Sequence, residues 1–170
     1  AIAAVLRAGY VVVNVNPLYT ARELAHQLKD SGAEAIVVLE NFCHVVQKVK
    51  ADTRLQHVIV TGVGDLLPRL KGALVNFVLR HVQKKVPHWN IPGAQRFRDV
   101  MQECDNCRPT PVQLTHDDLA YLQYTGGTTG VAKGAMLSHG NMVANIMQAQ
   151  AWFEQTTISY GTYYIALPLY

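Results

Sequence analysis

Glycines, threonines and one lysine are concentrated between residues 121 and 137, in the stretch YLQYTGGTTGVAKGAML. Glycine has no Cβ, so it lets backbone N–H groups approach a ligand closely and point toward it. Threonine hydroxyls donate hydrogen bonds to phosphate oxygens, and Lys133 supplies a mobile positive charge. An ordinary turn needs far fewer glycines. The composition therefore predicts a loop that binds a polyphosphate.

Two well-known phosphate loops are excluded by the spacing. Walker A needs a glycine directly before the lysine and a serine or threonine directly after it, whereas Ala132 and Gly134 flank Lys133 here. The Rossmann G-x-G-x-x-G spacing is absent, and a strand rather than a helix is expected after the loop. The loop must therefore hold phosphate with its own backbone and hydroxyls, without a helix dipole behind it.

Helix and strand patterns alternate in the first part of the chain. Strands buried on both faces are predicted from apolar, β-branched runs at residues 10–16, 33–40 and 57–62. Between the first two, Thr20 and Glu23 predict a capping box that starts a helix, and Gly32 predicts its end. This order favours an α/β fold with a mostly parallel sheet flanked by helices.

The second part of the chain must position the loop. A helical pattern at residues 66–86 stops at Pro87, and a short helix is expected at residues 97–101. A strand then leads into the glycine–threonine loop and a short strand leaves it. Ser138 is placed to cap a helix that continues to Phe153.

The helix at residues 66–86 is amphipathic and basic. Its apolar stripe consists of Leu70, Leu74, Phe77, Val78 and Val82. Its basic residues are Arg69, Lys71, Arg80, Lys84 and Lys85. One interpretation is a helix that lies on a membrane surface. We favour the other, an amphipathic helix that packs on its own domain.

Composition and charge exclude several classes of protein. The 170 residues are 49% hydrophobic and 16% charged, which is typical of a globular domain. A net charge of +3 is too small and too dispersed to indicate a nucleic-acid partner. No apolar run reaches the roughly 20 residues that span a bilayer. The three cysteines, an odd number, favour a reducing cytoplasm over a secreted disulfide framework.

A C-x-x-C pair, Cys104 and Cys107, could be a redox pair or half of a zinc site. Cys43 and the scattered histidines offer no second pair of ligands at a useful spacing. We interpret the pair as two free thiols in a loop and expect no metal site in the chain.

The loop sequence LQYTGGTTGVAKG resembles the nucleotide-binding signature of the adenylate-forming enzymes, which include acyl-CoA synthetases, luciferases and peptide-synthetase adenylation domains. Flanking segments, such as LRAGYVVVNVNPLYT and GAMLSHGNMVANIMQ, are similar to bacterial long-chain fatty acid–CoA ligases. The resemblance covers essentially the whole chain and is weakest at residues 95–118.

The resemblance implies that the full-length protein activates a fatty acid with ATP and Mg²⁺, through an acyl-adenylate, and transfers the acyl group to coenzyme A. The loop would close over the β- and γ-phosphates, with Tyr124 positioning it from the end of the strand. The implied ATP-binding residues are Tyr124, Thr125, Gly126, Gly127, Thr128, Thr129, Gly130, Val131, Ala132, Lys133, Gly134 and Ala135. Tyr170 would lie near the acyl pocket. Gly140 stands where many relatives have arginine, which puts a charge contact there in doubt.

The resemblance also implies that residues 1–170 are part of an N-terminal AMP-binding domain, truncated at both ends and lacking the C-terminal domain. The first residues read as a helix without a cap, and the last as a strand without a following turn. No catalytic residue is expected within the chain, and the isolated chain is expected to be inactive.

Three other interpretations stay open: a ligase for medium-chain or aryl acids, a non-catalytic nucleotide-binding module, and a generic α/β interaction domain. The expected partners are fatty acid, ATP and coenzyme A, without nucleic acid. The expected location is the cytoplasm. Two further possibilities stay open. The protein could contact the inner face of the cytoplasmic membrane peripherally, and it could form a homodimer.

Overall fold

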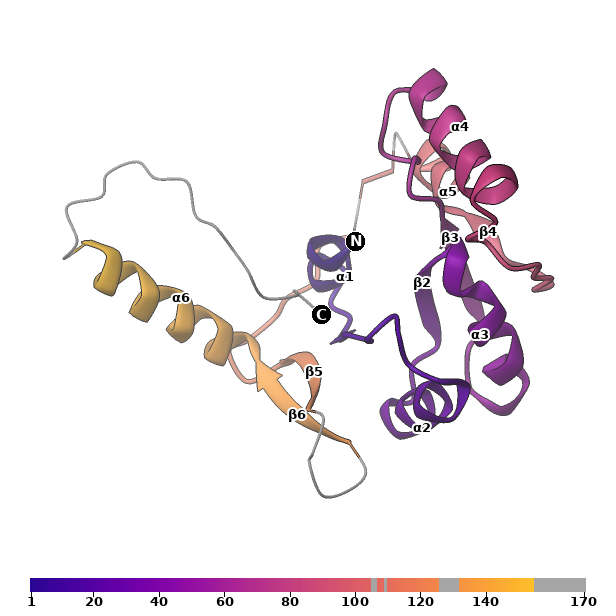
Figure 1. Cartoon of the computed structure of the whole chain (residues 1–170). Helices are drawn as coiled ribbons and strands as arrows, with labels where there is room; N and C mark the ends of the chain where they lie inside the picture. Colours follow the sequence, from indigo (N-terminus) through magenta and orange to yellow (C-terminus); the bar gives the residue numbers. More distant parts are fainter. Residues whose placement is uncertain (105–106, 109, 126–131, 155–170) are drawn as a thin grey trace. The chain divides into compact units, whose positions relative to one another are not determined.

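The computed structural model describes residues 1–104, 107–108, 110–125 and 132–154. The chain divides into two compact units, which are described separately (Figure 1). Unit 1 is formed by Ala1–Asn16 together with the chain from Thr110 onward, and unit 2 by Pro17–Pro109.

Unit 1 contains two helices and three strands in the described residues: α1 (Ile2–Arg7), β1 (Val12–Val13), β5 (Leu119–Thr125), β6 (Lys133–Ser138) and α6 (His139–Glu154). The helical and extended elements of unit 2 are α2 (Ala21–Ser31), β2 (Ala35–Leu39), η1 (Glu40–Phe42), α3 (Cys43–Val49), η2 (Lys50–Asp52), β3 (His57–Thr61), α4 (Arg69–Phe77), η3 (Val78–Val82), β4 (Gln95–Arg96) and α5 (Phe97–Glu103).

Unit 2 is built on a parallel sheet with the strand order β2-β3-β4. Its core consists of apolar side chains from α2, α3, β3 and nearby loops, all nearly inaccessible to solvent: Leu24, Leu28, Val46, Val49, Leu55, Val58, Val60 and Ile91. The predicted capping box begins α2, with both Thr20 and Glu23 bonded as expected, and Gly32 ends the helix at φ 64°. The α/β class with flanking helices is therefore confirmed.

The strands do not form one sheet as the sequence predicted. The strand expected at residues 10–16 is short, Val12–Val13, and pairs in parallel with β5 instead of with the strand at 33–40. Unit 1 therefore has its own sheet, β1-β5-β6, in which β5 and β6 are antiparallel. Periodicity identified the segment as a strand, but a partner far along the chain, outside any local pattern, determines where it pairs.

The prediction that the strand at 33–40 is buried on both faces is wrong for the described structure. Val37 is 43% exposed and Leu39 is 37% exposed, so one face of β2 is uncovered. An apolar run indicates that a strand can be covered on both faces, but it does not show that a second layer is present.

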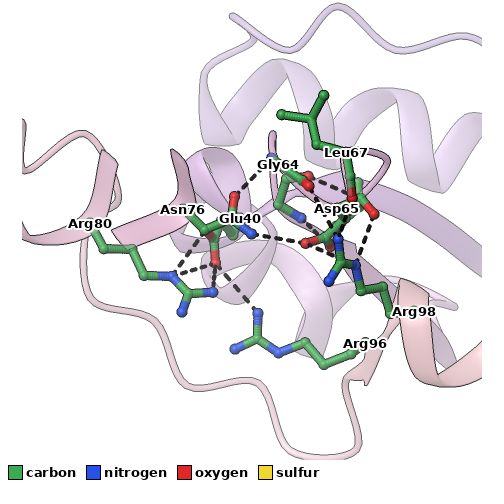
Figure 2. A network of polar contacts seen from close by, with 10 residues as sticks. Glu40, Gly64, Asp65, Leu67, Asn76, Arg80, Arg96 and Arg98 are labelled. Carbon is green, nitrogen blue, oxygen red and sulfur yellow. Dashed lines mark hydrogen bonds and ion pairs between the residues drawn. The ribbon is translucent and has the colours of Figure 1, made fainter. Parts of the chain in front are cut away.

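The predicted helix at residues 66–86 forms as α4 and continues as the π-helical turn η3. Our favoured interpretation, that its apolar stripe packs on its own domain, is wrong within the described residues. Leu70 is 87% exposed, Leu74 64% and Phe77 57%. The physical reason is that another, polar face of the helix attaches it to the rest of unit 2, through the contacts drawn in Figure 2.

Candidate phosphate-binding site

The glycine–threonine loop lies between the two strands of a hairpin, as the sequence predicted. In the antiparallel pair β5–β6, Thr125 is directly opposite Lys133 and Tyr124 is directly opposite Gly134 (the labels β5 and β6 in Figure 1). The ladder therefore fixes the positions of the two strand ends between which the loop sequence runs. A loop anchored in this way can present its backbone N–H groups to one ligand.

The loop leaves the sheet at a carboxyl edge. β5 is the central strand of β1-β5-β6 and runs parallel to β1, so both strands end at the same edge. Ligands of α/β proteins bind outside the carboxyl ends of parallel strands. A side-chain hydrogen bond joins the two strands near this edge: Asn14, just after β1, donates through Nδ2 to Oε1 of Gln123 in β5 over 3.1 Å.

Tyr124 and Gly134 fit each other across the hairpin. Tyr124 is 8% exposed, and its ring covers the backbone of Gly134. A Cβ added to Gly134 would lie 3.0 Å from Cζ of the tyrosine and 3.1 Å from its Cε2. The glycine at this position is therefore explained by packing against the ring, and the ring is held at the base of the loop.

Of the candidate ATP-binding residues, the structure brings Thr125 and Lys133 together at the loop end of the hairpin, where both are exposed to solvent. Ala132 is half-buried beside them, and Ala135 is exposed further along β6. The remaining loop candidates, Gly126, Gly127, Thr128, Thr129, Gly130 and Val131, lie outside the described residues. Tyr170, expected near an acyl pocket, lies outside them as well.

The predicted cap at Ser138 begins α6. The backbone N–H of Asn141 donates to Ser138 Oγ over 3.2 Å, and the N–H of Ser138 donates to Asn141 Oδ1 over 3.0 Å. Gly140 lies against the backbone of His116, and a Cβ there would be 2.9 Å from the His116 carbonyl oxygen. The absence of a side chain at Gly140 thus has a local steric reason.

A turn before β5 completes the frame of the hairpin and was not identified from the sequence. The backbone N–H and the hydroxyl of Thr115 both donate to the carboxylate of Asp118, which lowers the pKa of Asp118. The carbonyl of Asp118 accepts from the N–H of His139 at the start of α6. The T-x-x-D spacing was the available signal, since a carboxylate three residues after a threonine often closes such a turn.

The Asn14–Gln123 pair was also missed. The sequence offered one signal for it: Asn14 interrupts an apolar run, and a polar residue in such a run usually has a hydrogen-bond partner. That partner is 109 residues away, so the local pattern could not identify it.

In the part of the chain that the structure describes, no three or more His, Cys, Asp or Glu side chains gather in a way that could hold a metal ion. Its three cysteines are free thiols: Cys43 is buried, and Cys104 and Cys107 are exposed. The hydrogen bond to Cys107 raises the pKa of Cys104. No helix among the described residues has the length and apolar character needed to cross a bilayer.

Comparison with known proteins agrees with this geometry. The model of the AMP-binding enzyme family matches residues 1–170. The chain is 54% identical over 149 residues to a long-chain-fatty-acid–CoA ligase of Escherichia coli O157:H7, which covers 88% of the chain and 27% of that protein. It is 49% identical over 170 residues to the ligase of the same name from Haemophilus influenzae, covering 98% of the chain and 30% of that protein.

A solved structure supports the fold as well. The crystal structure of a long-chain-fatty-acid–CoA ligase from Archaeoglobus fulgidus superposes with a TM-score of 0.55 at 28% identity, over 87% of this chain and 24% of that one. The chain spans less than a third of the length of the curated relatives described above. Since the family model matches it from end to end, the chain belongs to the AMP-binding enzyme family.

Proposed function

We propose that the full-length protein containing this chain is a ligase that activates long-chain fatty acids to acyl-CoA. The observation that carries the proposal is the 54% identity to a protein named long-chain-fatty-acid–CoA ligase, in a stretch that includes the candidate loop. A hairpin loop at the carboxyl edge of parallel strands, with a lysine at its mouth, supports the same activity.

In the proposed reaction a carboxylate oxygen of the fatty acid attacks the α-phosphorus of ATP and pyrophosphate leaves. The sulfur of coenzyme A then attacks the acyl carbon of the acyl-adenylate, and AMP leaves with the bonding electron pair. Both steps create negative charge on a departing phosphate. Groups that stabilise this charge must be positioned in advance, because reorganising them during the reaction would raise the barrier.

The β5–β6 loop supplies such groups at the pyrophosphate side in this proposal. The exposed ammonium of Lys133 lies beside Thr125, whose hydroxyl is also exposed, so both can approach phosphate oxygens. The loop residues 126–131 add backbone N–H groups and the hydroxyls of two threonines. Tyr124, buried against Gly134, positions the loop without contacting the reacting atoms.

Mg²⁺ would accompany ATP and neutralise part of its phosphate charge. In such a site Mg²⁺ is usually held by one or two carboxylates together with the substrate phosphates and water. The proposal includes that the chain is part of an N-terminal AMP-binding domain and that Tyr170 is near the acyl pocket. The same proposal places the full-length protein in the cytoplasm, in contact with the inner face of the cytoplasmic membrane. It also includes that the protein forms a homodimer.

Pyrophosphate release by the purified full-length protein tests the substrate class. With ATP, Mg²⁺ and coenzyme A, we expect turnover with palmitate that exceeds turnover with 4-coumarate by at least about tenfold, a difference of roughly 1.4 kcal/mol in transition-state stabilisation. Faster turnover with 4-coumarate would identify an aryl-acid ligase. Nucleotide binding without turnover on any acid would identify a non-catalytic module.

A further inference from the structure

The helical segment Arg69–Val82 is attached to the rest of unit 2 by its polar face, which in most helices is turned to solvent. Its three attachment points, Gly72, Asn76 and Arg80, are four residues apart and so share one face of the helix. At Gly72 the helix backbone touches the turn at Gly64, where a Cβ on either glycine would overlap the carbonyl oxygen of the other.

The other two attachment points are polar and are drawn in Figure 2. Asn76 accepts from the N–H of Gly64 over 2.8 Å and donates to Asp65 Oδ1 over 2.9 Å. Arg80 forms an ion pair with Glu40, which is only 2% exposed. These contacts fix the rotation of the helix about its axis, so the orientation of its apolar face is determined within unit 2.

Leu70, Leu74 and Phe77 follow one another at spacings of four and three, on a different side of the helix from the attachment face. They are 87%, 64% and 57% exposed. Leu66, in the turn before the helix, is 86% exposed and Val82, at its end, 67%. Large apolar side chains that are exposed in a row along one face of a helix are a feature of binding surfaces, whereas single exposed apolar residues are common on any protein.

The charge around this stripe indicates its partner. Between Asp65 and Asp99 the sequence contains no acidic residue. Lys71 borders the stripe, and Lys84 and Lys85 follow the helix; all three are exposed. A helix that combines exposed leucine and phenylalanine with flanking lysines fits the interface of an anionic bilayer, where the apolar side chains enter the acyl boundary and the ammonium groups meet phosphates.

We infer that the stripe Leu66–Leu70–Leu74–Phe77, with its flanking lysines, docks on the surface of an anionic lipid bilayer. A second copy of the chain fits less well, since a symmetric contact would bring the two sets of lysines together. Nucleic acid would use the lysines but leave the leucines exposed to water. The inference names the membrane-contacting surface of the proposed ligase, yet it can fail while the ligase activity stands.

The test is co-sedimentation of the full-length protein with vesicles of phosphatidylethanolamine and phosphatidylglycerol, compared with pure phosphatidylcholine. The variant Leu70→Ser/Leu74→Ser is expected to lose vesicle binding by at least about tenfold. Its control, Leu18→Ser/Met101→Ser, removes equally apolar side chains that are 76% and 57% exposed elsewhere in unit 2, and it is expected to bind like the wild type.

The charged part of the inference has its own pair of variants. Lys71→Gln/Lys85→Gln is expected to weaken binding to the anionic vesicles by about fivefold for each lysine, and added salt should reduce this difference. The control Lys29→Gln/Lys48→Gln neutralises two exposed lysines on α2 and α3, away from the stripe. If both double variants lose vesicle binding equally, the lysines beside the stripe do not form a localised membrane-binding surface.

Two further readouts distinguish other occupants of the stripe. If another part of the polypeptide covers it, Leu70→Ser/Leu74→Ser will lower the Tm and leave vesicle binding unchanged. If a second copy covers it, the variant will convert dimer to monomer without affecting vesicles. Either result overturns the inference. The variant Leu70→Ser/Leu74→Ser is expected to form acyl-CoA from fatty acid dissolved in detergent. If the wild-type protein forms no acyl-CoA under these conditions, the proposed function is refuted but the inference about the membrane is not.

Discussion

The ring of Tyr124 covers the backbone of Gly134 on the opposite strand, so that a Cβ on the glycine would lie 3.0 Å from Cζ of the ring. The two residues are direct partners in the antiparallel pair that carries the candidate loop. This contact fixes the base of the loop and accounts for one of its glycines by packing.

Gly134→Ala is therefore expected to destabilise the protein by about 1–3 kcal/mol, the usual cost of overpacking. Without the contact, Gly134→Ala would stabilise the protein, because alanine restricts the unfolded chain more than glycine does. Urea denaturation measures the change. In a Tyr124→Leu background the extra cost of Gly134→Ala should disappear, and the same cost in both backgrounds would show that the ring does not cause it.

Glu40 is expected to contribute strongly to the attachment of the helical segment Arg69–Val82 to the rest of unit 2. Its buried carboxylate accepts from Arg80 and, at 3.4 Å, from Arg96 (Figure 2). Glu40→Gln removes the charge and leaves both guanidinium groups without their counter-ion, at an expected cost of about 2–4 kcal/mol. Glu34→Gln, at an exposed position, is the control. Equal urea midpoints for the two variants would contradict the role of the ion pair.

The three cysteines should differ sharply in reactivity. Burial, together with the negative charge of Glu40, raises the pKa of Cys43 to about 11, so its thiolate is scarce at neutral pH. Cys104 and Cys107 are exposed. Iodoacetamide at about pH 8 is expected to modify these two and spare Cys43 in the folded protein, as peptide mass spectrometry would show. Modification of Cys43 at the rate of Cys104, without urea, would be inconsistent with its burial.

The capping box of α2 should make part of the stability depend on acid pH. The hydroxyl of Thr20, and then its backbone N–H, donate to Glu23 and lower the pKa of that carboxylate from its usual 4.5. The stabilisation is complete above pH 4.5 and is lost as the pH falls through the lowered value. The Tm of Glu23→Gln should therefore be lower than that of the wild type at neutral pH, and this difference should shrink in acid. Glu34→Gln is the control for loss of an exposed carboxylate. A deficit independent of pH would show that the bonded carboxylate is not its source.

Features fixed by nearby residues could be predicted from the sequence. The capping box at Thr20, the end of α2 at Gly32 and the cap at Ser138 depend on side chains within a few positions of one another. The strand–loop–strand order of the candidate site was predictable for the same reason, since glycines and threonines interrupt two apolar segments.

Features fixed by distant partners could not be predicted. Val12–Val13 pairs with β5 and not with the next strand along the chain, and no local pattern records that choice. The stripe of α4 has the same 3–4 spacing whether it faces a core or solvent. Its orientation depends on Gly64, Asp65 and Glu40, which lie outside the helix. The Tyr124–Gly134 contact depends on hairpin register in the same way.

The central claim, that the β5–β6 loop binds the phosphates of ATP, is tested most directly by the steady-state kinetics of Lys133→Ala in the full-length protein. Lys29→Ala, at an exposed position on α2, is the control. We predict that kcat/KM for ATP falls by at least about tenfold in Lys133→Ala, roughly 1.4 kcal/mol of lost charge stabilisation, and stays at the wild-type value in the control. Unchanged ATP affinity and turnover in Lys133→Ala would contradict the claim.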